Sequence, residues 1–233
     1  MKGYRHKSEE HKKPLNWKKI GIVFSCVLFA VVMIVAGMGS TWLNAFKDAK
    51  PGNTAYIDFT FRDEMSRPII TTNSNVMEKG LEAGNVVFKA NQIIVPVNIS
   101  ANTDLETIPV AHPNIPNLVY FGLTGDEIDA IRYGVTGMKV NEDRVISIPD
   151  TTGMIGAVNI ATMDDQFKQQ IEMATPGDQI LMPFVYNPDG SKDNSTQEAY
   201  YRTGTLISKE GDNAVINYRY PTVEIRLTQL NNS

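Results

Sequence analysis

The sequence holds little cysteine and little histidine, and these scarcities exclude several kinds of chemistry. One cysteine and three histidines occur among 233 residues. Cys26 lies in an apolar run, so the residues after it cannot form a disulfide with one another. His6 and His11 precede that run and His112 stands alone beside a proline, so no histidine or cysteine cluster is present to bind a transition metal. We therefore expect no metal ion and no other cofactor.

Motifs for covalent catalysis and nucleotide binding are also missing. The chain has no GxSxG sequence, no glycine-rich phosphate loop and no plausible Ser/His/Asp set. Asp164 and Asp165 are adjacent, so on a helix they diverge and do not form an acid pair. Any reaction here must need little more than a shaped apolar pocket.

Charge is absent between Lys19 and Lys47. The uncharged run is long enough to cross a bilayer, and Trp42 stands where an interfacial aromatic is expected. We predict a basic cytoplasmic tail at 1–19 and a transmembrane helix at 20–44. A cleaved signal peptide is the alternative. It is disfavoured because the run exceeds the usual signal core and no clean A-x-A site follows.

The formal charge of the chain is unevenly distributed. Residues 1–19 carry seven basic and two acidic side chains, a net charge of +5, so the remainder of a chain of net charge −4 carries −9. The positive-inside rule places the basic end in the cytoplasm and the rest outside the cell membrane. An acidic outer domain also argues against nucleic acid as a partner. Sequons at Asn98 and Asn194 are glycosylation candidates.

After a polar stalk at 45–53, the pattern is that of a strand-rich α+β domain. The helix predicted at 124–134 is the clearest element, because Thr124 and Glu127 have the spacing of a capping box and Gly134 stands at the end. The other expected elements are helices at 76–84 and 164–174 and strands at 54–61, 69–72, 144–148, 177–186, 200–208 and within 213–230.

The segment "EIDAIRYGVTGMKVNEDRVISIPD" (127–150) resembles the helix–turn–strand of FKBP-type peptidyl-prolyl cis-trans isomerases. The stretches 52–61 and 213–230 are similar to the opening and closing strands of that family. The residues that match the central motif are Ile128, Gly137, Met138, Glu142, Ile148 and Pro149.

This resemblance implies an FKBP-like antiparallel sheet wrapped over a short helix, spanning 54–230. Two insertions, near 73–118 and 157–200, would interrupt it. Chaperone-like family members insert a flap domain that grips unfolded chains at the second of these places. The resemblance also implies rotation of X-Pro bonds, a reaction that breaks no covalent bond and faces a barrier of roughly 18–20 kcal/mol.

Carried over residue by residue, the family's catalytic pocket falls on Phe59, Ile128, Ile131 and Ile155, with the backbone amide of Ile128 as donor to the substrate carbonyl. Isoleucine stands where the family has a pocket-floor aromatic and a tyrosine. The family's pocket aspartate falls on Ile70 or Thr71. Each lost aromatic removes roughly 0.5–1.5 kcal/mol of stacking, so catalysis is expected to be weak or absent. The alternative is that these apolar residues are simply core.

Three functions remain open on this basis. The first is a membrane-anchored isomerase and folding helper for exported proteins, whose partners are unfolded or proline-containing polypeptides. The second is a non-catalytic protein-binding or chaperone module with the same fold. The third is a structural subunit of an envelope complex. An exposed apolar slot would favour the first two, and a slot filled by the first insertion would favour the third.

Overall fold

The computed structural model describes residues 17–37, 47–149, 154–186 and 198–231. The chain divides into two compact units, Met1–Leu43 and Asn44–Ser233. In the first unit, α1 (Trp17–Gly37) begins three residues before the predicted membrane helix, and no side chain in it is buried. Its 21 residues span about 32 Å. This helix is therefore long and apolar enough to cross a bilayer. Trp42 and the end predicted at 44 lie outside the described residues.

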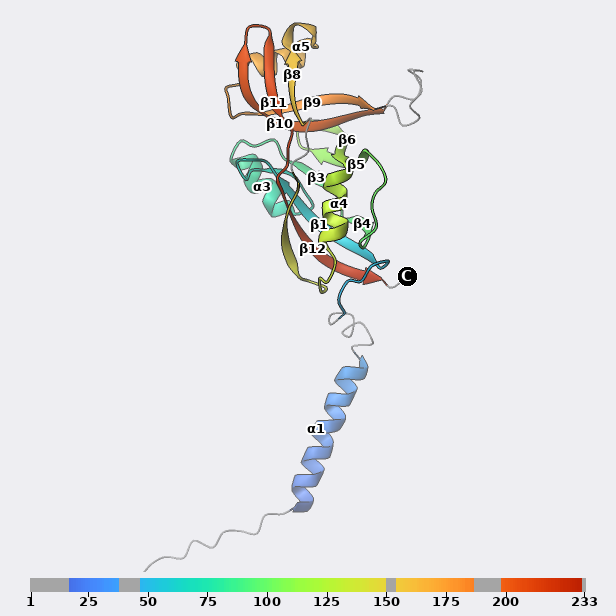
Figure 1. The fold of residues 1–233 in the computed structure, drawn as a ribbon. Coiled ribbons are helices and arrows are strands. Elements are labelled where there is room, and N and C mark those ends of the chain that lie inside the picture. The colour runs from blue at the N-terminus through green and yellow to red at the C-terminus, as the bar shows by residue number, and fades with distance from the viewer. Residues whose placement is uncertain (1–16, 38–46, 150–153, 187–197, 232–233) are drawn as a thin grey trace, which may run out of the picture. The chain divides into compact units, whose positions relative to one another are not determined.

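The second unit is an α+β fold built on one large mixed sheet (Figure 1). Among the described residues the sheet has twelve strands, of which ten follow the order β7-β12-β1-β2-β3-β5-β6-β10-β11-β8, with β4 beside β1 and β9 beside β10. The strands are β1 (Thr54–Arg62), β2 (Pro68–Thr71), β3 (Phe88–Ala90), β4 (Ile93–Pro96), β5 (Leu105–His112), β6 (Ile115–Thr124), β7 (Asp143–Ser147), β8 (Ile155–Asn159), β9 (Gln179–Tyr186), β10 (Glu198–Glu210), β11 (Asn213–Asn217) and β12 (Thr222–Asn231).

The expectation of a purely antiparallel sheet is corrected at two pairings. β2 and β3 are parallel because the chain crosses between them through α3 (Ser74–Glu82). β6 and β10 are also parallel and meet at Phe121 and Tyr201. β3 lies within the first predicted insertion, whereas Phe121 and Tyr201 lie just beyond the ends predicted for the two insertions. The sheet is therefore mixed.

The helix α4 (Gly125–Gly134) forms for the reasons its sequence indicates. The side chain of Thr124 accepts from the Glu127 amide, and the Glu127 carboxylate accepts from the Thr124 amide, so the predicted capping box is present. Ile128 and Ile131 face the core from this helix. A Cβ on Gly134 would lie 2.0 Å from Cδ1 of Ile146, so an alanine in the last turn of α4 would force the Ile146 side chain on β7 to move.

The described residues of the second unit form two hydrophobic cores, and we name the parts around them the first and second lobes. The first lobe comprises residues 47–149 and 219–231 and contains β1 to β7, β12, α3 and α4. The second lobe comprises residues 154–186 and 198–218 and contains β8 to β11 and α5 (Asp165–Met173), grouped together in Figure 1. It interrupts the chain between β7 and β12, which pair directly with each other. Two chain segments connect the lobes, and a hydrogen bond of 2.8 Å from the Ile148 amide to the Pro221 carbonyl joins these segments to each other.

The two predicted insertions are built differently. The first, near 73–118, contributes strands to the part of the sheet that lies in the first lobe, and Phe88, Ala90 and Val110 belong to the core of that lobe. The second, predicted at 157–200, belongs to a lobe that extends to residue 218 and has its own core. Only the second has the character of an added module.

Candidate functional site

The residues predicted to form an isomerase pocket are not assembled into one. Phe59, Ile128 and Ile131 belong to the core of the first lobe and are 2%, 1% and 0% exposed. Ile155 is 50% exposed on β8, the last strand in the sheet order, and is not part of that core. The first three residues therefore pack as core, and the fourth lies apart from them.

The backbone donor predicted at Ile128 also falls within the helix. With Thr124 as the N-cap, Ile128 is the fourth helical residue. That position is the first whose N–H is directed to an intrahelical carbonyl, here that of Thr124. A substrate carbonyl would have to compete with this helical bond.

Of the two sequons, one can be placed. Asn98 is exposed, has a φ of 57°, and donates its backbone N–H to the Arg132 carbonyl at 2.8 Å. The hydroxyl of Ser100 donates to Asp129 at 2.7 Å. Asn98 is thus accessible as a modification candidate, whereas Asn194 lies outside the described residues.

A buried ion pair joins the second lobe to α4. The guanidinium of Arg202 on β10 donates to both carboxylate oxygens of Glu127, at 2.9 and 2.7 Å, and each side chain is 3–4% exposed. Arg202 also donates to the carbonyls of Gly122 and Tyr218. Its guanidinium carbon lies 4.5 Å from the centre of the Tyr220 ring. The Arg202 side chain thus links α4, β6 and the segment between β11 and β12.

The protonation states in this junction are fixed by burial and charge. Burial by itself would lower the pKa of Arg202, but the charge and hydrogen bonds of Glu127, together with Tyr220 and Tyr200, raise that pKa above its ordinary value. Burial raises the pKa of Tyr218 and of Tyr220. The arginine therefore stays charged and both tyrosines stay neutral, which suits a structural junction.

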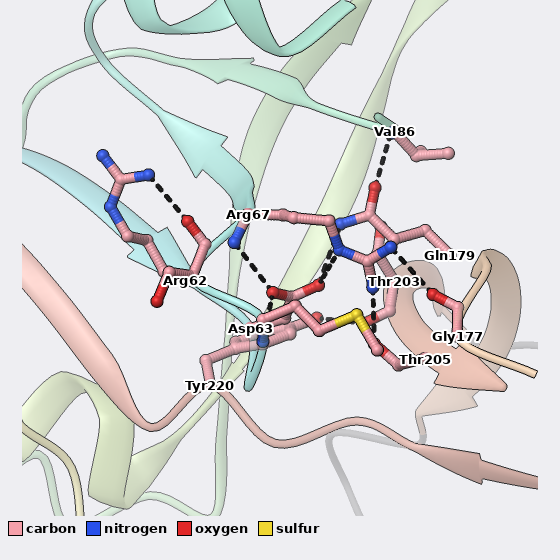
Figure 2. A network of polar contacts seen from close by, with 11 residues as sticks. Arg62, Asp63, Arg67, Val86, Gly177, Gln179, Thr203, Thr205 and Tyr220 are labelled. Atoms are coloured by element: carbon pink, nitrogen blue, oxygen red, sulfur yellow. Dashed lines mark hydrogen bonds and ion pairs between the residues drawn. The ribbon is translucent and has the colours of Figure 1, made fainter. Parts of the chain in front are cut away.

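A second polar network, centred on Asp63, joins the lobes at the turn after β1 (Figure 2). Asp63 is buried and accepts from Nε of Arg67 at 2.7 Å and from Nε2 of Gln179 at 3.1 Å. Arg67 donates onward to the Gly177 carbonyl at 2.8 Å and to the Thr205 hydroxyl at 3.1 Å. Three of these five residues belong to the second lobe, so the network holds that lobe against the first.

A groove of about 600 Å³ lies between the β5–β6 hairpin and α5. Its walls include His112, Ile115 and Pro116 from the first lobe and Phe167, Leu181 and Tyr201 from the second. A hollow of about 400 Å³ adjoins it and shares Gln170. We call the 600 Å³ space the inter-lobe groove. No Asp, Glu, Lys or Arg lines it among the described residues.

His112 keeps the groove uncharged near neutral pH. Desolvation lowers the pKa of its imidazole below the usual value. The Nδ1 atom accepts from the Asn114 amide at 3.2 Å, and the ring lies 5.2 Å from that of Phe88. The hydrogen bond from Asn114 suits the neutral form, since Nδ1 of a protonated ring could not accept it.

Another groove, of about 540 Å³, lies over the polar face of β1, β12 and β7. Ion pairs cross that face, from Arg62 to Glu224 at 2.8 Å and from Arg226 to Asp143 at 3.8 Å. These pairs are partly or largely exposed, and exposed pairs contribute little. The described residues contain no group of His, Cys, Asp and Glu that could hold a metal ion. We assign no chemistry to this face.

Sequence reasoning missed both junctions between the lobes. The spacing of Thr124 and Glu127 identified a capping box but gave no sign that Arg202, 75 residues away, would share the same carboxylate. Asp63 and Arg67 resemble an ordinary turn in the sequence. The one available signal was that Arg202 is the only charged residue in the strand predicted at 200–208.

The comparisons with known proteins give no family. No protein-family model matches the chain, and no curated protein matches it.

Proposed function

We propose that this protein is a membrane-anchored folding helper that binds non-native polypeptides in the inter-lobe groove, with an FKBP-like first lobe and little or no isomerase activity. In this proposal the basic segment before α1 lies in the cytoplasm and the second unit lies outside. The asymmetry of charge around α1 supports that orientation.

The observation that carries the proposal is the inter-lobe groove itself. It is walled by aromatic, aliphatic and amide side chains and is held open between two lobes that are tied by buried polar networks. Ligand pockets are mostly apolar with a few polar groups, and they form preferentially between domains. Chaperone-like FKBP proteins place an inserted module at the same point of the chain, which adds support by resemblance.

An efficient isomerase is less well supported. The resemblance rests on the α4–turn–β7 segment, whose strand β7 pairs with β12, and β12 pairs in turn with β1. Three of the four apolar side chains that would line the slot are buried in the core, and isoleucine stands at two of the family's aromatic positions. The alternative of a structural subunit is favoured by the same burial, but it leaves the inter-lobe groove without a role.

The proposal predicts that the full-length protein in lipid nanodiscs slows aggregation of a reduced, alkylated and permanently unfolded reporter protein. Phe167→Asp is expected to lower the affinity for the reporter by at least tenfold, because it places an unpaired charge in an apolar wall. Light scattering gives the aggregation rate, and fluorescence anisotropy of the labelled reporter gives the affinity.

Gln169→Asp is the matched control. Gln169 is exposed on the same helix and does not line the groove, so it should leave reporter binding unchanged. Equal loss in both variants would point to damage of α5 rather than of the groove. Unchanged binding in Phe167→Asp would contradict the proposed site.

Prolyl isomerisation is expected to be within about twofold of the uncatalysed rate for a tetrapeptide series with varied residues before proline. The physical reason is that Ile128 and Ile131 are inaccessible and the amide of Ile128 is directed into the helix. A protease-coupled assay with the full chain measures this. Acceleration of a hundredfold or more would replace the present proposal by a working isomerase.

A further inference from the structure

We infer that the inter-lobe groove selects extended, uncharged apolar segments flanked by basic residues, and holds them through side chains rather than by adding a strand to the sheet. This inference rests on the proposed function and specifies its client.

The lining of the groove sets the character of the central segment. Its walls offer Phe167, Leu181 and Tyr201 on one side and Ile115 and Pro116 on the other. A charged side chain entering between them would lose its hydration and find no described partner of opposite charge. An apolar segment would instead replace water on both walls. The adjoining hollow that shares Gln170 extends the space along α5, which suits an extended chain rather than a compact one.

Strand addition at this place is opposed by the edge of β9. Gln170 of α5, with its amide nitrogen toward the carbonyl of Leu181, donates to that oxygen at 3.3 Å and accepts from the Leu181 amide at 3.2 Å. Both backbone groups of Leu181 therefore point away from β10. Pro183, two residues further along β9, also directs its backbone away from β10, and a proline has no N–H to donate. A side chain and a proline thus block the edge that a client strand would need.

Acidic residues at the edge of the groove determine which residues are favoured on either side of the bound apolar segment. Asp164 and Asp165 are exposed at the start of α5, next to the groove-lining Gln166 and Phe167. Asp178 lies on the adjoining hollow, where the other charged lining residue, Arg67, is already ion-paired with Asp63. The chain after residue 19 has a net charge of −9. Basic flanks on a client would be attracted to both ends while the apolar centre occupies the walls.

Four fluorescent peptides with a shared eight-residue apolar design test the inference on the full chain in zwitterionic nanodiscs, with empty nanodiscs as background. One has paired lysines on each flank, one has paired glutamates, one has lysine flanks with a central glutamate, and one has lysine flanks with alternate backbone amides methylated. Anisotropy at low and at high salt gives each affinity.

The lysine-flanked peptide is expected to bind about tenfold more tightly than the glutamate-flanked one at low ionic strength, with the difference shrinking in high salt. A central glutamate should lower affinity at least tenfold. The methylated peptide should bind within about twofold of its parent. Asp164→Asn with Asp165→Asn should reduce the flank preference, and Phe167→Asp should abolish binding while Gln169→Asp does not.

Loss of binding on backbone methylation would overturn the side-chain mode, and equal or tighter binding of the glutamate-flanked peptide would overturn the charge preference. In either case, reporter binding that still depends on Phe167 would leave the proposed function standing. Absence of both reporter and peptide binding would overturn the proposed function together with this inference.

Discussion

Replacing Glu127 with alanine is expected to destabilise the second unit by about 3–5 kcal/mol. Arg202 is 3% exposed, and both carboxylate oxygens of Glu127 accept from it. Without Glu127 the guanidinium remains buried with two carbonyl partners and no counter-charge. The penalty arises from this uncompensated charge rather than from the lost attraction alone.

The measurement is urea unfolding of the full chain in nanodiscs, followed by near-UV circular dichroism of the tyrosines, because Trp17 and Trp42 both precede the second unit. Thr124→Ala is the control for the capping box, which Glu127 also completes, and should cost about 1 kcal/mol. The double variant Glu127→Leu with Arg202→Met should recover most of the loss. If Glu127→Ala destabilised the protein no more than Thr124→Ala does, the ion pair with Arg202 would not be the main contribution of Glu127 to stability.

Local sequence signals predicted the parts of the fold that depend on neighbouring residues. The capping box of α4, its end at Gly134 and the following strand were all readable because each depends on residues a few positions apart. The apolar alternation of residues 57, 59 and 61 likewise gave the buried face of β1. These elements were predicted within about two residues.

The arrangement of lobes depends on contacts between distant residues, and no local pattern contains them. The parallel pairing of β6 with β10 joins Phe121 to Tyr201 through a single register position. A Cβ on Gly122 would lie 2.4 Å from the ring of Tyr200, so this glycine permits the close approach, yet in the sequence it reads as a weak point in a strand.

The predicted pocket had the same limitation. Ile155 was matched to a pocket position of the family only by its place in the sequence after Pro149. The chain enters the second lobe just before Ile155, so this match does not hold in space. The inter-lobe groove was not predicted at all, because its walls come from residues 86–116 and 166–201. Sequence reasoning thus identified the two inserted segments but not the space between them.

Asp63→Ala is expected to cost about 2–4 kcal/mol and to loosen the second lobe selectively. This loss of stability is smaller than that expected for Glu127→Ala, because the Arg67 side chain is 22% exposed and can gain some hydration when its partner is removed. The variant removes the acceptor shared by Arg67 and Gln179, and Arg67 in turn holds Gly177 and Thr205. Since Gln179 also accepts from the Val86 amide at 2.7 Å, the wall of the groove should shift as well.

Hydrogen–deuterium exchange of the full chain distinguishes selective loosening from general destabilisation. Exchange should rise in α5 and β9, while β1 and β12 keep the protection of the first lobe's core. Glu224→Ala is the matched control, since it removes the carboxylate partner of Arg62 from a more exposed pair and should cost no more than about 1 kcal/mol. Client affinity should fall in Asp63→Ala and stay unchanged in Glu224→Ala. Uniform exchange across both lobes would show that the Asp63 network supports the whole unit rather than the geometry of the groove.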